Sequence, residues 1–171
     1  MRLVVKKESW PRFCAKAGIA LTIIWAAGTA FADRYRIGID SQVVKCIPGY
    51  SVYLIDKKDL ELKRDAIYVF TARGLQPVYE DGTEMVKYLR GIPGDHIAIK
   101  YQGNIYVNDK YVGYGLSHAE KIGQPEESFL GEAKLKPGNY WFMGTSDQSF
   151  DSRYWGTVKD DQIIGRAYPL F

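Results

Sequence analysis

Cysteine and histidine are scarce in this 171-residue chain, which has two of each. The sequence shows no cluster of His, Cys and Asp with metal-ligand spacing and no glycine-rich phosphate loop. It therefore predicts no metal ion and no other cofactor. Without a cofactor, acyl transfer is the reaction class that the polar side chains described below can support.

An excess of charge is also missing, since 23 basic and 20 acidic residues give a net charge of +3. Five basic residues and one acidic residue within residues 1–16 give this end a net charge of +4, which leaves −1 for the rest. A nearly neutral body without a basic stripe argues against nucleic acid as a partner. We interpret residues 1–12 as a basic segment that stays in the cytoplasm.

Residues 13–32 form the one long apolar run, with Lys16 as its only charged residue. A helix of about 16–20 residues is roughly 24–30 Å long, enough for a short membrane span. Lys16 lies near one end, where its side chain can extend to the headgroups. We therefore predict a transmembrane anchor over residues 13–32 that contacts membrane lipid. The alternative is a cleaved leader, because Ala-Phe-Ala at residues 30–32 matches the small-x-small cleavage pattern.

Residues 33–171 are predicted to form an all-β body. Apolar alternation, short apolar runs and turn residues predict strands at residues 34–40, 51–56, 67–71, 97–101, 104–108, 140–144 and 163–167. Residues 114–136 are polar with little periodicity, and we interpret them as a loop-rich insert. The sequence has no internal repeat, and many short strands with turn signals indicate a single β fold.

The most informative stretch is residues 85–95, Met-Val-Lys-Tyr-Leu-Arg-Gly-Ile-Pro-Gly-Asp. Lys87 lies in an apolar, strand-like run that ends at a sharp Gly-Ile-Pro-Gly-Asp turn. Neighbours such as Val86 and Leu89 would partly desolvate the lysine, and desolvation favours the neutral amine, which can act as a general base. The alternative is a surface lysine on an edge strand.

Two further stretches are residues 46–49, Cys-Ile-Pro-Gly, and residues 149–156, Ser-Phe-Asp-Ser-Arg-Tyr-Trp-Gly. Together and in this order, the three stretches resemble the type I signal peptidase family of membrane-bound serine proteases, over roughly residues 40–171. The Cys-Ile-Pro spacing and the short segment before Ser149 are similar to the conjugative-transfer (type IV secretion) branch. The resemblance implies a mainly β, signal-peptidase-like barrel or sandwich with a small insert, preceded by one transmembrane helix.

The resemblance also implies roles for individual residues. Cys46 occupies the position of the family's serine nucleophile, and Lys87 that of its lysine base. Ser149 would hydrogen-bond the lysine amine and orient it, while Asp151 would pair with Arg153 and hold that segment in place. The turn after the lysine strand would support the site, and its matching residues are Gly91, Pro93, Gly94 and Asp95.

The cysteine at position 46 departs from the family's serine. A thiol loses its proton more readily than a hydroxyl, so a Cys–Lys pair is chemically able to act. A structural cysteine and a site that has lost activity are alternatives. Ser41 is the better alternative nucleophile and Ser51 the weaker. The family's oxyanion donor, a hydroxyl two residues before the nucleophile, is missing, because that position is Val44.

The implied function is that of a membrane-anchored endopeptidase that matures exported precursors. The first candidate substrate is the pilin of a conjugative type IV secretion system, with cleavage alone or cleavage and cyclisation. The helix would lie in the bacterial inner membrane and the body in the periplasm. Three alternatives stay open: a non-catalytic pilus-assembly protein on a peptidase fold, a housekeeping leader peptidase, and an exported β-sheet binding module.

Overall fold

A computed structural model describes residues 9–171 of the protein. The chain divides into two compact units, Met1–Tyr35 and Arg36–Phe171. Most of the predicted basic segment, residues 1–8, lies outside the described residues.

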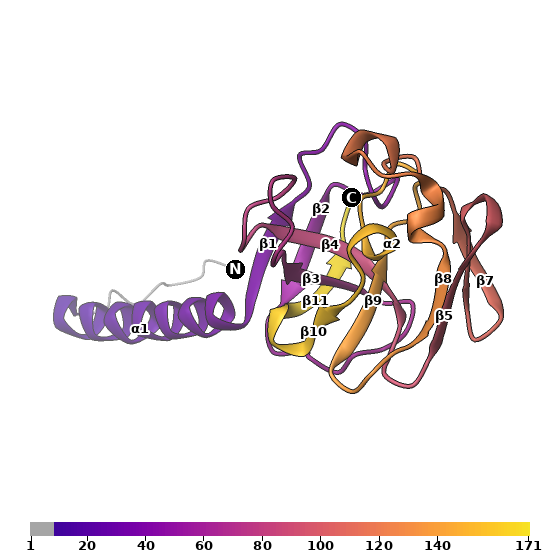
Figure 1. Cartoon of the computed structure of the whole chain (residues 1–171). Helices are drawn as coiled ribbons and strands as arrows, with labels where there is room; N and C mark the ends of the chain where they lie inside the picture. The colour runs from indigo at the N-terminus through magenta and orange to yellow at the C-terminus, as the bar shows by residue number, and fades with distance from the viewer. Residues whose placement is uncertain (1–8) are drawn as a thin grey trace, which may run out of the picture. The chain divides into compact units, whose positions relative to one another are not determined.

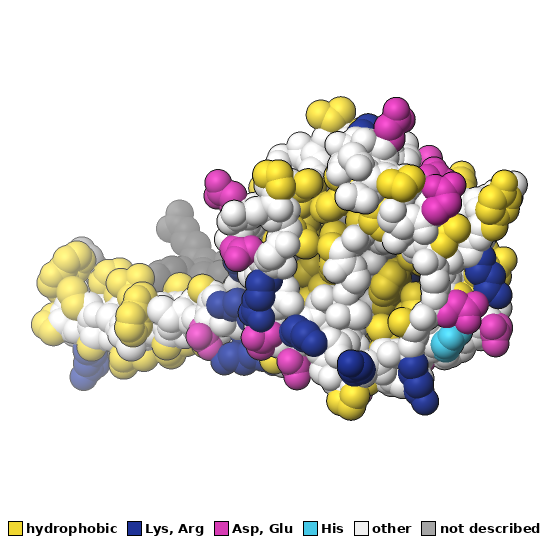
Figure 2. Space-filling model, viewed as in Figure 1, with side chains coloured by type: hydrophobic (Ala, Val, Ile, Leu, Met, Phe, Trp, Pro, Cys, Tyr) yellow, Lys and Arg dark blue, Asp and Glu magenta, His cyan; other side chains and the backbone are white. Residues whose placement is uncertain are grey.

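The described part of the first unit is dominated by helix α1, Trp10–Arg34 (Figure 1). Its 25 residues correspond to about 37 Å at the usual rise per residue. No side chain of the helix is buried, and apolar side chains run along its length (Figure 2). The hydroxyls of Thr22 and Thr29 donate to carbonyls of the same helix. By length and composition α1 could cross a membrane, and it contains the whole predicted anchor, residues 13–32.

Two sheets make up the rest of the chain (Figure 1). The larger has the strand order β1-β2-β11-β3-β4-β9-β10. Its strands are β1 (Tyr35–Ile39), β2 (Val52–Asp56), β3 (Ile67–Thr71), β4 (Glu84–Gly91), β9 (Asn139–Met143), β10 (Val158–Lys159) and β11 (Ile163–Pro169). The strands predicted for this region are confirmed to within two residues at each end. The prediction missed β10 and the short helix α2, Ser152–Trp155.

The smaller sheet has the order β7-β6-β5-β8, and all of its pairs are antiparallel. Its strands are β5 (His96–Lys100), β6 (Asn104–Val107), β7 (Lys110–Tyr114) and β8 (Gly131–Lys134). The predicted hairpin formed by β5 and β6 is confirmed.

The expectation of a loop-rich insert over residues 114–136 is wrong for its last part. Two short 3-10 helices, Glu120–Ile122 and Glu126–Phe129, fit that expectation, but β8 pairs with β5 as an edge strand. All four residues of β8 are exposed, so the strand has no apolar alternation. Its position follows from backbone pairing, which hydrophobic periodicity does not report.

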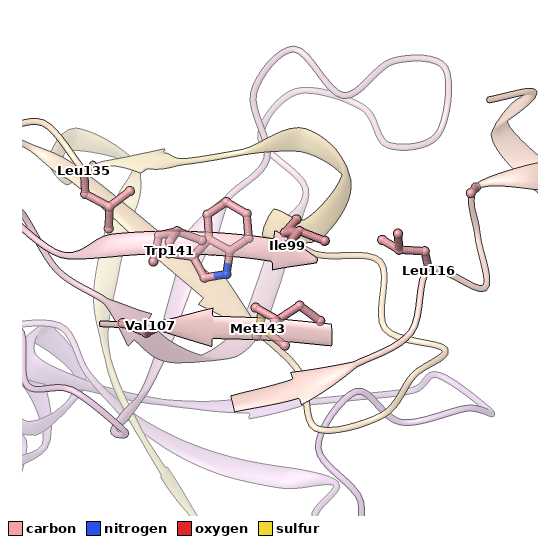
Figure 3. Close-up of a cluster of buried hydrophobic side chains, with 9 residues drawn as sticks. Ile99, Val107, Leu116, Leu135, Trp141 and Met143 are labelled. Carbon is pink, nitrogen blue, oxygen red and sulfur yellow. The ribbon is translucent and has the colours of Figure 1, made fainter. Parts of the chain in front are cut away.

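Strand β9 connects the two sheets through the alternation of its side chains. Trp141 and Met143 pack in a cluster with Ile99 and Val107 of the smaller sheet and with Leu135, which directly follows β8 (Figure 3). Phe142 packs on the other side, in a cluster whose other buried members are Tyr68, Phe70, Ala72, Met85, Leu89 and Val158. Because both faces of β9 are covered, the residues that follow it are held against the body.

Candidate active site

Lys87 lies on β4, in the same every-second-residue series as Met85 and Leu89. All three side chains are buried, and Lys87 is only 4% exposed. No ion pair joins Lys87 to another of residues 9–171. The alternative of a surface lysine on an edge strand is wrong, because β4 lies between β3 and β9. Buried lysines are rare, and this one occupies a position where its neighbours in the series are apolar.

Cys46 lies in the loop between β1 and β2, and its side chain is buried. Its carbonyl accepts a hydrogen bond from the Thr145 N–H at 2.9 Å. Its own backbone N–H has no hydrogen-bond partner in the described part of the chain. Cys46 and Lys87 line one pocket of about 220 Å³. The fold therefore brings a buried thiol and a buried amine to the same hollow.

Gly144 marks the point at which the predicted site segments meet. Continuing the antiparallel register of β4 and β9 by one residue places Lys87 opposite Gly144. A Cβ atom on Gly144 would lie only 2.6 Å from the Cys46 carbonyl oxygen and would also collide with the Ser149 hydroxyl. The absence of a side chain at Gly144 thus allows the Cys46 loop and the Ser149 segment to approach the end of β9.

Ser149 is fully buried, and its hydroxyl oxygen has no hydrogen-bond partner in the region that the structure describes. Its backbone is well held, because its N–H donates to the Ser146 carbonyl and its own carbonyl accepts from Arg153. A buried hydroxyl without a partner is uncommon and calls for an explanation. The predicted hydrogen bond between Ser149 and the Lys87 amine stays a prediction, and the Ser149 hydroxyl is free to make it.

Asp151 and Arg153 form a fully buried, bidentate ion pair. Nε and Nη2 of Arg153 each lie 2.8 Å from a carboxylate oxygen of Asp151. Burial alone would lower the pKa of Arg153, but the hydrogen bond and charge of Asp151 raise the pKa above its ordinary value. The guanidinium also donates at 2.9–3.0 Å to four backbone carbonyls, those of Tyr114, Gly115, Ser146 and Ser149. The pair thus joins the segment after β9 to the end of β7.

The Gly-Ile-Pro-Gly-Asp turn lies between β4 and β5, where the chain passes from one sheet to the other. Gly91 has no room for a side chain, and Gly94 has a φ of +93°. Asp95 accepts hydrogen bonds from Arg64 at 2.9 Å and from Asn108 at 2.7 Å. None of the predicted supporting residues of this turn, including Pro93, lines the pocket with Cys46 and Lys87.

Burial and hydrogen bonding shift the pKa of Asp95 in opposite directions. Burial raises the pKa of Asp95, but hydrogen bonds from Arg64, the Ile92 N–H and Asn108 more than offset this effect and lower the pKa below its usual value. Arg64 and Asn108 come from opposite sides of the turn in sequence. The turn therefore acts as a junction between the sheets.

Ser41, the alternative nucleophile, lines the pocket but is exposed, whereas Ser51 does not line it. Several residues without a role predicted from the sequence also line this pocket, among them Asp40, Gln42, Tyr53 and Tyr79. The first two are close to Cys46 in sequence, which is a signal that could have drawn attention to them. Tyr79 lies in a distant loop and offers no such signal.

Tyr53 and Asp40 each present an unpaired polar atom near the pocket. The Tyr53 hydroxyl and one carboxylate oxygen of Asp40 are buried without a hydrogen-bond partner in residues 9–171. Burial, aided by the charge of Asp40, raises the pKa of Tyr53 to about 12. The hydroxyl is therefore a neutral donor at physiological pH.

The two histidines lie outside this pocket. His96 is 3.4 Å from Glu132, and His118 Nε2 is 2.6 Å from the Gln148 carbonyl oxygen. Among the described residues, no group of three His, Cys, Asp or Glu side chains could hold a metal ion.

Comparison with known proteins gives concordant matches. The family model described as "Signal peptidase, peptidase S26" matches residues 10–171. A probable signal peptidase I-2 of Synechocystis sp. is 30% identical over 122 residues, which cover 69% of this chain and 53% of that protein. Signal peptidase IB of Staphylococcus aureus is 27% identical over 165 residues, which cover 87% of this chain and 82% of that protein. The chain thus spans about half the length of the Synechocystis relative.

A solved structure of a signal peptidase I from Enterococcus faecalis matches 62% of this chain and 96% of that chain, with 23% identity and a TM-score of 0.40. The family model covers the described chain from α1 to its last residue. On the strength of that match, the chain belongs to the signal peptidase family, peptidase S26.

Proposed function

We propose that this chain is a signal-peptidase-like endopeptidase in which Cys46 is the nucleophile and Lys87 the general base. The observation that carries the proposal is the single pocket lined by a buried thiol and a buried amine. Membership of the signal peptidase family supports the same reaction. The substrate is a precursor protein with small residues before the cut, bound in an extended conformation at the edge of the sheet.

Acylation needs a deprotonated sulfur. Neutral Lys87 takes the proton from Cys46, and the sulfur attacks the carbonyl carbon of the scissile peptide bond. A C–S bond forms while the carbonyl π electrons move to the oxygen, which becomes an oxyanion. When the carbonyl re-forms, the C–N bond breaks and the Lys87 ammonium returns its proton to the leaving amine.

Deacylation reverses these roles. Lys87 takes a proton from water as the water oxygen attacks the thioester carbon. The C–S bond then breaks, the new carboxyl group leaves, and the thiolate recovers its proton from Lys87. Ser149 has a positioning role, because its free, buried hydroxyl can fix the direction of the amine.

We further propose that α1 anchors the enzyme in the bacterial inner membrane with the body in the periplasm. The length and apolar composition of the helix support the anchor, and the basic residues before it support the orientation. This orientation would put Cys46 outside the cytoplasm. Cys46 would be a free thiol there, because the structure pairs it with no other cysteine.

The finer proposal is that the substrate is the pilin of a conjugative type IV secretion system. It is supported by the Cys-Ile-Pro spacing and by the short segment before Ser149. The thioester accepts whichever nucleophile reaches it, so water gives a linear product and the pilin's own α-amine gives a cyclic one. The site chemistry permits both outcomes.

The test is co-expression of the chain with a candidate pilin precursor, followed by intact mass spectrometry of the product. Cys46→Ala and Lys87→Ala should abolish cleavage, while Ser41→Ala should leave it intact. Ser128→Ala is the control for serine loss and Lys100→Ala the control for lysine loss, because both residues are exposed and lie outside the pocket. A product lighter by one further water than the hydrolysed pilin would identify cyclisation.

One observation favours a second candidate function. Val44 stands where the resembled family has an oxyanion hydroxyl, and it is 58% exposed with no donor in its side chain. A pilus-assembly protein without catalysis would tolerate this loss. Equal processing by wild type, Cys46→Ala and Lys87→Ala would support that function and overturn the peptidase proposal.

A further inference from the structure

Acyl transfer through Cys46 creates an oxyanion next to the sulfur, and this charge needs hydrogen-bond donors that are already in place. The free backbone N–H of Cys46 can supply one donor. The side chain of Val44 cannot supply a second. A second donor must therefore come from another group close to the sulfur.

Gln42 is the side chain that the structure places in hydrogen-bond contact with the sulfur. The Cys46 thiol donates to Gln42 Oε1 at 3.4 Å, so the glutamine amide lies beside the reacting atom. Both residues line the pocket that contains Lys87. A carboxamide carries two N–H donors on the group opposite its oxygen.

While the thiol keeps its proton, the amide oxygen of Gln42 is the group that can bond to the sulfur. Once the proton is lost, the amide N–H is the group that can do so. The neutral thiol donates to Oε1, but a thiolate, and then an oxyanion beside it, can only accept. The terminal torsion of glutamine has two broad orientations. A half-turn about it replaces the carbonyl oxygen with an N–H group without moving the rest of the side chain.

Tyr79 is suited to hold the amide in either orientation, because a phenol hydroxyl both donates and accepts. Tyr79 and Gln42 line the same pocket. Burial raises the pKa of Tyr79, and the neighbouring Gln42 amide partly offsets that rise. The Tyr79 ring packs against Phe150, with 5.8 Å between ring centroids. Phe150 lies between Ser149 and Asp151, so the Tyr79 ring packs against the segment that carries the buried Asp151–Arg153 pair.

The backbone of Gln42 is held as well. Its N–H donates to the Asp40 carboxylate at 3.0 Å, and the Lys45 amine donates to the Asp40 carbonyl at 3.0 Å. These bonds close the loop that carries Gln42 and Cys46. The backbone at Gln42 is thus fixed before the reaction, and only the terminal torsion of its side chain has to turn.

We propose that the side-chain amide of Gln42 donates a hydrogen bond to the oxyanion, in the place of a hydroxyl at position 44, and that Tyr79 orients it. The proposal rests on the proposed peptidase function. It makes Gln42 a catalytic residue and Tyr79 a positioning residue.

The test uses the full chain in detergent and a fluorogenic peptide with Ala-x-Ala before the cut. Gln42→Met keeps the length of the side chain but removes both donors, and it should lower kcat about 100- to 1,000-fold with KM within about threefold. Gln124→Met is the control, because Gln124 is an exposed glutamine outside the pocket. Val44→Ser in the Gln42→Met background should recover part of the lost kcat. Tyr79→Phe should give a smaller fall in kcat.

A binding measurement separates oxyanion stabilisation from substrate binding. A peptide aldehyde forms a tetrahedral adduct with the sulfur, whereas the corresponding peptide alcohol does not. Gln42→Met should weaken the aldehyde about 100-fold and leave the affinity for the alcohol unchanged. Equal weakening of both, or a rise in KM with unchanged kcat, would assign Gln42 to substrate binding and overturn the proposal.

The two proposals fail in different ways. Full cleavage by Gln42→Met, with none by Cys46→Ala, overturns the Gln42 role and leaves the peptidase intact. Cleavage by Cys46→Ala at the wild-type rate overturns both.

Discussion

Two segments approach each other at Gly144, and they are held in very different ways. The segment from Gly144 to Arg153 contains the buried Asp151–Arg153 pair, whose guanidinium reaches four further carbonyls. The loop from Ser41 to Gly49 carries the thiol, and most of its residues are exposed. Ile47 is buried against the sheet, but the exposed part of the loop is held by single hydrogen bonds, such as those that Asp40 accepts.

We infer from this difference that one segment mainly supports the stability of the fold and the other mainly carries the reaction. The rigid segment holds groups that position others, while the loosely held loop carries the group proposed to react. Substitutions in the first should therefore lower the free energy of unfolding. Substitutions of the exposed residues in the second should lower the rate of cleavage while leaving stability almost unchanged.

The largest expected effect is on the buried ion pair. Arg153→Met leaves the Asp151 carboxylate buried without its cation, and it should lower the free energy of unfolding by about 3–5 kcal/mol. Urea unfolding of the full chain in detergent, followed by tryptophan fluorescence, measures this change. Arg73→Met removes a pair with Asp161 in which both side chains are more than half exposed, and it should cost at most about 1 kcal/mol. If Arg153→Met and Arg73→Met lowered the free energy of unfolding by similar amounts, the buried pair would not be a special source of stability, and the proposed difference between the two segments would be wrong.

The next effect concerns Gly144, where the two segments touch. Gly144→Ala puts a Cβ atom against the Cys46 carbonyl and the Ser149 hydroxyl, and it should cost about 1–3 kcal/mol of stability. Cleavage should also fall, because both segments must move. Gly18→Ala is the control, since nothing lies within 4 Å of that position in α1, and alanine favours a helix. An unaffected Gly144→Ala protein would contradict the close approach.

A smaller, pH-dependent effect is expected at the junction between the sheets. Because the pKa of Asp95 is lowered by folding, its contribution to stability is present above its unfolded pKa of about 4 and disappears as pH falls through the folded value. Arg64→Met should therefore cost about 1 kcal/mol at pH 7, reduced because Arg64 is partly exposed. The loss should shrink as pH falls below about 4.

Urea unfolding at several pH values measures the Arg64→Met effect. Lys63→Met is the matched control, since Lys63 pairs with Glu61 on the surface, and its effect should be small at every pH. A constant difference between Arg64→Met and wild type from pH 7 to pH 3 would contradict the role of the Asp95 charge.

The smallest expected change in stability is in the loop. Lys45→Met removes the hydrogen bond to the Asp40 carbonyl and should change the free energy of unfolding by less than about 0.5 kcal/mol. The rate of cleavage should nevertheless fall about fivefold, which corresponds to about 1 kcal/mol in the barrier, because Gln42 and Cys46 lose a brace. Lys121→Met, an exposed change outside the pocket, should alter neither quantity. A large loss of stability in Lys45→Met would contradict the comparison.

Periodicity located most strands, but it could not find contacts between them. The apolar run of residues 67–71 predicts β3 without reference to any partner, because burial on a sheet leaves a local pattern. Strand β8 has no such pattern and became visible only as a partner of β5. The junction at Asp95 is similar, since Arg64 and Asn108 lie 31 and 13 residues from it.

By itself, the sequence determined the family, the mainly β class and the apolar helix, because motifs, alternation and long apolar runs are local properties of a chain. Only the tertiary structure decided that Lys87 is buried, that Cys46 shares its pocket, and that Gln42 lies beside the thiol. It also decided that Gly144 must lack a side chain. The physical reason is that strand register and loop closure choose which distant residues become neighbours, and a site depends on those neighbours.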